Sequence, residues 1–202
     1  MPATPRAFGP AAPVRWPRWQ DRWSRPTLRL RCATESDLPV LAGIQEGGLR
    51  PFVEAYYPWD PRSFREHFRP EETRVLESAR GIAGFYQIQS RADHLFLAEL
   101  HVELGHRNHG LGELLLNCAL AEAEAENLPL RLWVLRNNPA RQLYLRLGFR
   151  DSGEGSCHLV MERGTSGNQT SANGPVLSPT RSTLTPKRSS NETYRFVMGL
   201  PR

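Results

Sequence analysis

The sequence has few cysteines and no long apolar run. Cys32, Cys118 and Cys157 are an odd number with no close spacing, so neither a disulfide framework nor a zinc-binding pair is indicated. No stretch approaches the roughly 18 consecutive apolar residues of a membrane span, and the N-terminal residues lack the apolar core of a secretory signal. We therefore expect a soluble, cytoplasmic protein without a membrane partner.

Lysine is absent from residues 27–163, where 16 arginines are outnumbered by 19 Asp and Glu. The formal charge of the whole chain is nevertheless +5, so the positive excess lies in residues 1–26 and 164–202. Nucleic-acid surfaces need clustered Lys and Arg to neutralise phosphates. We expect no nucleic-acid binding through the central part of the chain.

The two ends are expected to be disordered. Residues 1–26 place six prolines among Arg and Trp, which excludes a continuous helix or a central strand. Residues 164–202 are rich in Ser, Thr, Asn and Pro and have too few apolar residues to offset the entropy of ordering; only 194–198 could dock locally. Residues 27–163 have a common size for a single domain.

A glycine-rich turn, Arg107-Asn108-His109-Gly110-Leu111-Gly112, follows the apolar run 95–102 and opens the apolar-periodic segment 111–126. Backbone N–H groups at a helix start have no intrahelical partner and favour anions. A P-loop is excluded by Glu113 and Leu114, and the dinucleotide fingerprint is excluded by Leu115. On these residues alone, a phosphate site and a simple bend both stay open.

A second motif follows the short apolar run 132–135. Taken together, the two motifs resemble those of the GNAT family of acyl-CoA-dependent N-acetyltransferases, over about residues 27–163. The family's pyrophosphate loop is matched by Arg107, Gly110 and Gly112. Its later motif is matched by Asn137, Ala140, Tyr144, Gly148 and Phe149.

The order of predicted elements suits that family's fold. Strands are expected at 28–32, 74–78, 82–89, 95–102, 132–135 and 157–162, and helices at 111–126 and 140–147. Thr34 to Asp37 resembles a capping box that starts a helix to about residue 45, and Asp60-Pro61 starts another to about 68. We predict an α/β (α+β) fold with a mixed, mostly antiparallel sheet of six to seven strands and helices on both faces.

The resemblance implies transfer of the acetyl group of acetyl-CoA directly to a primary amine, on a small molecule or a peptide, without a metal. The alternative is a catalytically silent GNAT-fold module that binds CoA or regulates a partner through its basic ends. Nucleic-acid binding by those ends is a third hypothesis. The oligomeric state stays open, with a homodimer as one option.

The resemblance also implies a cofactor site. The backbone of Leu100, His101 and Val102 would pair with the pantetheine amides, and the amides of residues 107–112 would hold the pyrophosphate. Asn137 would bond the pantetheine arm, with Asn138 and Pro139 as cap and first turn of the next helix. Tyr144 would protonate the departing thiolate; its alternative role is that of a core aromatic. The implied cofactor residues are Leu100, His101, Val102, Arg107, Asn108, His109, Gly110, Leu111, Gly112, Asn137, Ala140 and Tyr144.

Glu99 is the candidate base, because it is the only ionised group in the apolar run 95–100. An alkylammonium has a pKa near 10.4, so the amine must lose a proton before it attacks. Strand alternation predicts Glu99 on the face of Leu97 and His101, opposite Phe96, Ala98 and Leu100. The alternative is a carboxylate bonded to backbone or water. His101 is a weaker candidate base.

The acceptor side is expected in residues 50–60, between the first two helices. Glu54, Tyr57 and Trp59, with Asp60, combine carboxylates and aromatic rings that suit a cationic amine. Alternatively, Phe52, Tyr56 and Trp59 pack the helix connection. The identity of the amine stays open.

Overall fold

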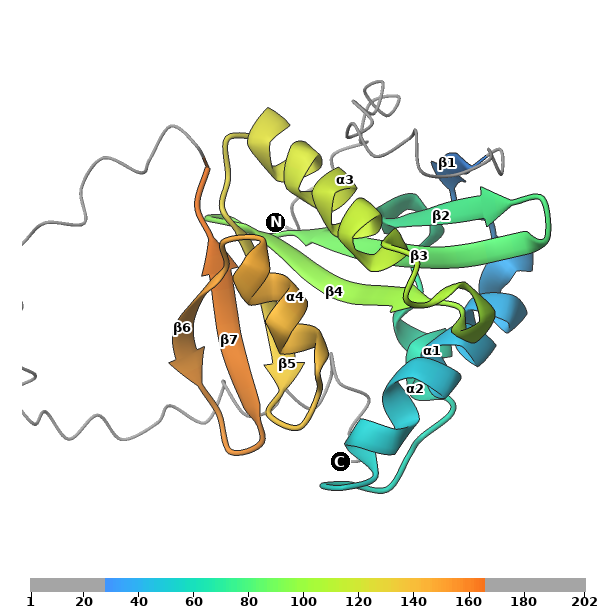
Figure 1. The fold of residues 1–202 in the computed structure, drawn as a ribbon, viewed down its shortest axis with the longest axis horizontal. Helices are drawn as coiled ribbons and strands as arrows, with labels where there is room; N and C mark the ends of the chain where they lie inside the picture. Colours follow the sequence, from blue (N-terminus) through green and yellow to red (C-terminus); the bar gives the residue numbers. More distant parts are fainter. Residues whose placement is uncertain (1–27, 166–202) are drawn as a thin grey trace, which may run out of the picture.

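A seven-stranded sheet forms the centre of the computed structural model, which describes residues 28–165 (Figure 1). The strand order is β1-β2-β3-β4-β5-β7-β6, and every neighbouring pair is antiparallel except β4 and β5. The predicted mixed, mostly antiparallel sheet is confirmed. The strands are Arg29–Cys32 (β1), Thr73–Ser78 (β2), Gly81–Ser90 (β3), Leu95–Val102 (β4), Leu130–Leu135 (β5), Arg150–Glu154 (β6) and His158–Arg163 (β7).

Helices cover both faces of the sheet, as predicted (Figure 1). Helices α1 (Leu38–Val53) and α2 (Ser63–His67) bury Leu41, Phe64 and Phe85 on one face. Helices α3 (Leu111–Ala125) and α4 (Ala140–Arg146) enclose the larger core on the other. Short 3-10 turns lie at Glu35–Asp37, Pro70–Glu72 and Leu104–His106. No helix in the described part of the chain is long and apolar enough to cross a membrane.

Three element boundaries differ from the sequence predictions. Helix α1 continues to Val53 instead of ending near residue 45, although it contains Pro51. Its buried Leu41, Ile44 and Val53 show that packing overrides weak local propensity. Strand β6 was not expected: all five residues are exposed, and only pairing with β7 makes this edge a strand. Helix α2 begins at Ser63, not directly after Asp60. The ends predicted to be disordered lie outside the described residues, except for Gly164 and Thr165.

Asp37 fixes the start of α1. Its carboxylate accepts from the backbone N–H of Thr34 at 2.7 Å and from the Thr34 hydroxyl at 2.9 Å, as the capping-box pattern predicts. Arg31 of β1 donates to both oxygens, at 2.7 and 2.9 Å. These bonds, that of Arg31 foremost, hold the pKa of Asp37 well below its usual range. The carboxylate therefore joins the sheet edge to α1.

We expect Asp37→Asn to lower the free energy of unfolding by about 2 kcal/mol at pH 7, because charge-assisted bonds to a buried carboxylate are lost. Since the folded-state pKa is depressed, this stabilisation is present above the pKa of the unfolded chain, about 4, and is lost as the pH falls further. Urea denaturation at pH 7 and pH 3 measures it. The control Asp93→Asn removes an exposed carboxylate bonded to His94 and should change stability little. Equal losses for both variants would contradict the assignment.

Candidate active site

Strands β4 and β5 separate part-way along the sheet. They pair in parallel from Leu95 with Leu130 to Leu97 with Leu132. Beyond that point β4 stays with β3, and β5 stays with β7. The separated halves leave a cleft of about 420 Å³ at the centre of the sheet.

A bulge in β4 decides which side chains face which helices. Gln87 pairs with Glu99 and Ile88 with Leu97, so Ala98 is an extra residue without a partner. The prediction that Glu99 shares a face with Leu97 is therefore wrong. Leu97 belongs to the core under α3 and Leu100 packs against it, whereas Glu99 bonds to Gln45 of α1.

The turn before α3 has the geometry of an anion site. Gly110 is the N-cap residue of α3 with a left-handed φ of 77°, and Asn108 has a φ of 62°. A Cβ on Gly110 would meet no atom within 4 Å, so the space beside this residue is open. Arg107 braces the turn by donating its Nε to the Val102 carbonyl at 3.1 Å. The first N–H groups of a 15-residue helix thus border the cleft.

Most of the predicted cofactor residues line the cleft. His109 and Asn137 do not line it. Asn137 donates its side-chain amide to the carbonyl of Phe52 at 3.2 Å, which ties the loop after β5 to the end of α1. Its neighbour Asn138 lines the cleft instead and caps α4 through a 2.9 Å bond to the N–H of Ala140. The residues that line it are Leu100, His101, Val102, Arg107, Asn108, Gly110, Leu111, Gly112, Ala140 and Tyr144.

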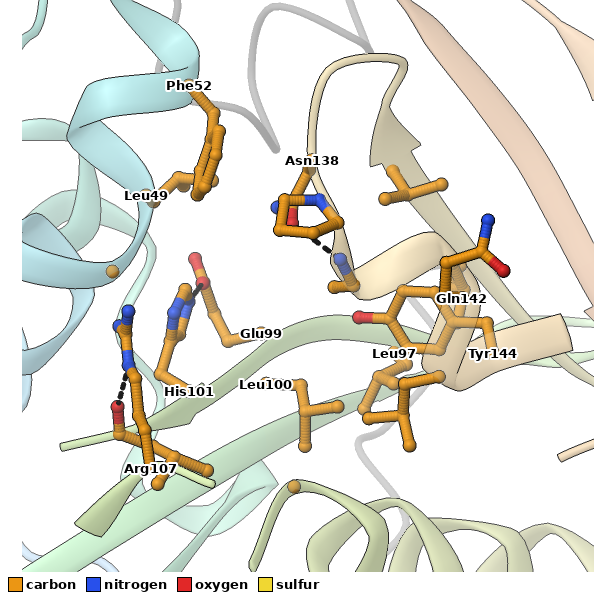
Figure 2. Close-up of a pocket in the computed structure, with 18 of the residues that line it drawn as sticks. Leu49, Phe52, Leu97, Glu99, Leu100, His101, Arg107, Asn138, Gln142 and Tyr144 are labelled. Atoms are coloured by element: carbon orange, nitrogen blue, oxygen red, sulfur yellow. Dashed lines mark hydrogen bonds and ion pairs between the residues drawn. The ribbon is translucent and has the colours of Figure 1, made fainter. Parts of the chain in front are cut away.

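The Glu99 carboxylate is held at both oxygens. One lies 2.5 Å from Nε2 of His101, and the other accepts from Nε2 of Gln45 at 3.2 Å. The Glu99 and His101 side chains are only 11% and 10% exposed, yet both line the cleft (Figure 2). The His101 ring also packs against the ring of Phe85, with the two ring centroids 5.3 Å apart. An oriented carboxylate therefore faces the gap between β4 and β5.

Tyr144 lies across the gap from Glu99, on the side of α3 and α4. Its ring packs against Phe149 in the larger core, and its hydroxyl points toward the cleft (Figure 2). Burial, and secondly the charge of Glu99, raise the pKa of this phenol well above its usual value. Tyr144 therefore stays protonated at neutral pH and can donate a proton or a hydrogen bond.

The predicted acceptor residues lie beside the cleft but do not line it. Glu54 is exposed and pairs with Arg50 at 2.8 Å. Tyr57 accepts a bond from the Cys157 thiol at 3.6 Å, and Trp59 packs against the cluster around Val53. On this side, Leu49 and Phe52 of α1 line the cleft instead. Phe52 falls within the expected segment 50–60, but as part of a connection and not of a helix. Leu49 was not predicted because the helix was expected to end near residue 45, although 41, 45, 49 and 52 repeat at helical spacing.

Comparison with known proteins agrees with this geometry. A family model described as an acetyltransferase (GNAT) domain matches residues 69–151, which include β4, the glycine turn and α4. Residues 69–151 thus form a GNAT acetyltransferase domain. No curated protein sequence matches the chain. Within residues 28–165 of this GNAT protein, no group of three or more His, Cys, Asp or Glu side chains is arranged to hold a metal ion.

Solved structures share the GNAT fold at low identity. PaiA N-acetyltransferase from Thermoplasma acidophilum, in complex with coenzyme A, is 18% identical with a TM-score of 0.59, covering 68% of this chain and 99% of its own. The ribosomal-protein-S18-alanine N-acetyltransferase of Escherichia coli is 21% identical with a TM-score of 0.57, covering 74% and 99%. N-acetylglutamate synthase from Neisseria gonorrhoeae, complexed with coenzyme A and N-acetyl-glutamate, is 19% identical with a TM-score of 0.55, covering 70% and 36%.

Proposed function

We propose that this protein transfers the acetyl group of acetyl-CoA to a primary amine. The observation that carries the proposal is the cleft between β4 and β5, which is bordered by the glycine-rich turn before α3 and contains Glu99 and Tyr144. The amides at the start of α3 suit the pyrophosphate of CoA. Where β4 separates from β5, the backbone groups of residues 100–102 are available to the pantetheine arm. Asn138 lines the cleft, so its side-chain amide is better placed than that of Asn137 to bond this arm.

Glu99 is the proposed proton acceptor. It takes a proton from the acceptor ammonium, directly or through one water, and the free amine attacks the thioester carbonyl. The new C–N bond forms as the C–S bond breaks, and Tyr144 donates its proton to the leaving thiolate. The amide nitrogen loses its second proton to water, and water returns a proton to the Tyr144 phenolate. Glu99 and Tyr144 suit these roles because they lie on opposite sides of the gap in which the thioester would sit.

Binding of the cofactor is tested by its effect on stability. We expect acetyl-CoA at 100 times its Kd to raise the Tm of the full chain by at least about 5 °C, because ligand binding to the folded state adds about 2.7 kcal/mol. Differential scanning fluorimetry measures the shift. Gly110→Asp is the control: Asp tolerates the left-handed φ, but its charge would repel the pyrophosphate. A folded wild-type chain with no shift would exclude the proposal.

The acceptor requires a separate screen. Thiol release from acetyl-CoA would be followed with polyamines, aminoglycosides, amino acids and peptides with free N-termini. An amine-dependent rate identifies the acceptor class. If acetyl-CoA binds but no amine releases thiol, a CoA-binding regulatory module becomes the better hypothesis.

A further inference from the structure

Helix α1 reaches the candidate base from outside the cleft. Gln45 is only 7% exposed and does not line the cleft, yet its Nε2 lies 3.2 Å from an oxygen of Glu99. A buried glutamine needs a partner, whereas a leucine at the same position would bury apolar surface without one. For packing alone, a glutamine is therefore less favourable than a leucine at this position. What Gln45 provides in addition is the hydrogen bond to Glu99.

The two partners of Glu99 leave one acceptor position on each carboxylate oxygen. A carboxylate offers about four lone-pair sites, and Gln45 and His101 occupy one on each oxygen. The Glu99 side chain is thus held in one orientation by the amide of Gln45 from α1 and by the imidazole ring of His101 from β4. The remaining lone pairs are free to meet an amine or a water in the cleft.

The close approach of α1 depends on Gly48, three residues after Gln45. A Cβ at this position would lie 2.9 Å from a terminal nitrogen of Arg107 and 3.2 Å from Nδ1 of His101. Glycine inside a helix is about 1 kcal/mol less favourable than alanine. Here it lets the helix lie directly against His101, so that α1 supports both partners of the carboxylate.

We propose that Gln45 is a positioning residue that orients Glu99 for proton transfer, with His101 as the second support. This inference rests on the proposed acetyltransferase function and on Glu99 as the base. The amide of Gln45 stabilises the ionised carboxylate and fixes its direction toward the cleft, but Gln45 does not contact the substrates.

The test is Gln45→Met in the full chain, which keeps the side-chain length and removes the donor. We expect kcat to fall about tenfold because the base is misplaced, with the KM for acetyl-CoA unchanged within about twofold. The loss in kcat should shrink as the pH rises toward the amine pKa near 10.4, because less of the acceptor then needs a base. Leu41→Met, one turn earlier on the same helix face, is the matched control and should keep the wild-type kcat and profile.

A double-mutant cycle separates positioning from general damage. If Gln45 acts through Glu99, Gln45→Met should change kcat less than about twofold in a Glu99→Gln background. Tm values establish that each variant is folded; should Gln45→Met be unstable, Gln45→Glu replaces it and should lower kcat through like-charge repulsion. Wild-type kcat and pH profile in Gln45→Met, or fully additive losses in the double mutant, would overturn the positioning role alone. An unimpaired Glu99→Gln enzyme would overturn Glu99 as the base, and a wild type without acetyl transfer would overturn the proposed function as well.

Discussion

Glu99→Gln is expected to lower kcat by roughly 10² to 10⁴ at neutral pH, which is the range that a positioned base contributes. Glutamine keeps the size of the side chain but cannot accept the proton of the ammonium. The loss should shrink as the pH rises toward the amine pKa near 10.4, because more of the acceptor is already the free base. Thiol release across pH 6 to 10, with the best acceptor from the screen, measures this.

The control for this variant is Glu162→Gln. Glu162 pairs with Arg131 at 2.6 Å on neighbouring strands outside the cleft, so its loss should leave kcat unchanged. The Tm of both variants should show that each is folded. If Glu99→Gln and the wild type gave pH–rate profiles of the same shape, Glu99 would not be the base, and His101 would become the candidate.

Gly84→Ala is expected to destabilise the fold by about 3 kcal/mol. Gly84 lies in β3, where an added Cβ would be 2.6 Å from the carbonyl oxygen of His101 and 3.3 Å from the Cα of Val102. These are backbone atoms of β4, which cannot move aside as a side chain can. The strand would have to shift at the residues proposed to pair with pantetheine, so acetyl-CoA binding should weaken too.

Urea denaturation and the acetyl-CoA-induced Tm shift would measure both effects of Gly84→Ala. The matched control is Gly43→Ala, on an exposed position of α1 where a Cβ meets no atom within 4 Å. Because alanine is the better helix former, this control should be neutral or stabilising by up to about 1 kcal/mol. Destabilisation by the same amount at both positions would show that the contact with β4 is not the cause.

The sequence alone predicted those parts of the site that a local pattern encodes. The turn before α3 was recognised because glycine spacing and the following apolar period both lie within about twenty residues. Tyr144 was placed by its spacing to Gly148 and Phe149. Residues brought in by packing were missed: Gln45 reaches Glu99 across 54 positions of sequence, through a helix whose length could not be predicted from local propensity.

The face of Glu99 was mispredicted for a different reason. Alternation along a strand is reliable only while the strand is regular, and Ala98 gives no sequence signal that it is an unpaired residue. Strand β6 was missed because its residues show no apolar alternation: it is an edge strand with both faces exposed.

The bulge at Ala98 lets one residue of β4 be gained or lost without turning the residues of the cleft. Deleting Ala98 would leave Leu97 directly before Glu99, still opposite Ile88 and Gln87, so Glu99 and His101 would keep facing α1. The same residues in a regular strand that kept Ala98 would instead turn Glu99 toward α3. When related sequences are aligned, a one-residue gap placed here would therefore join residues that face the same layer of the protein.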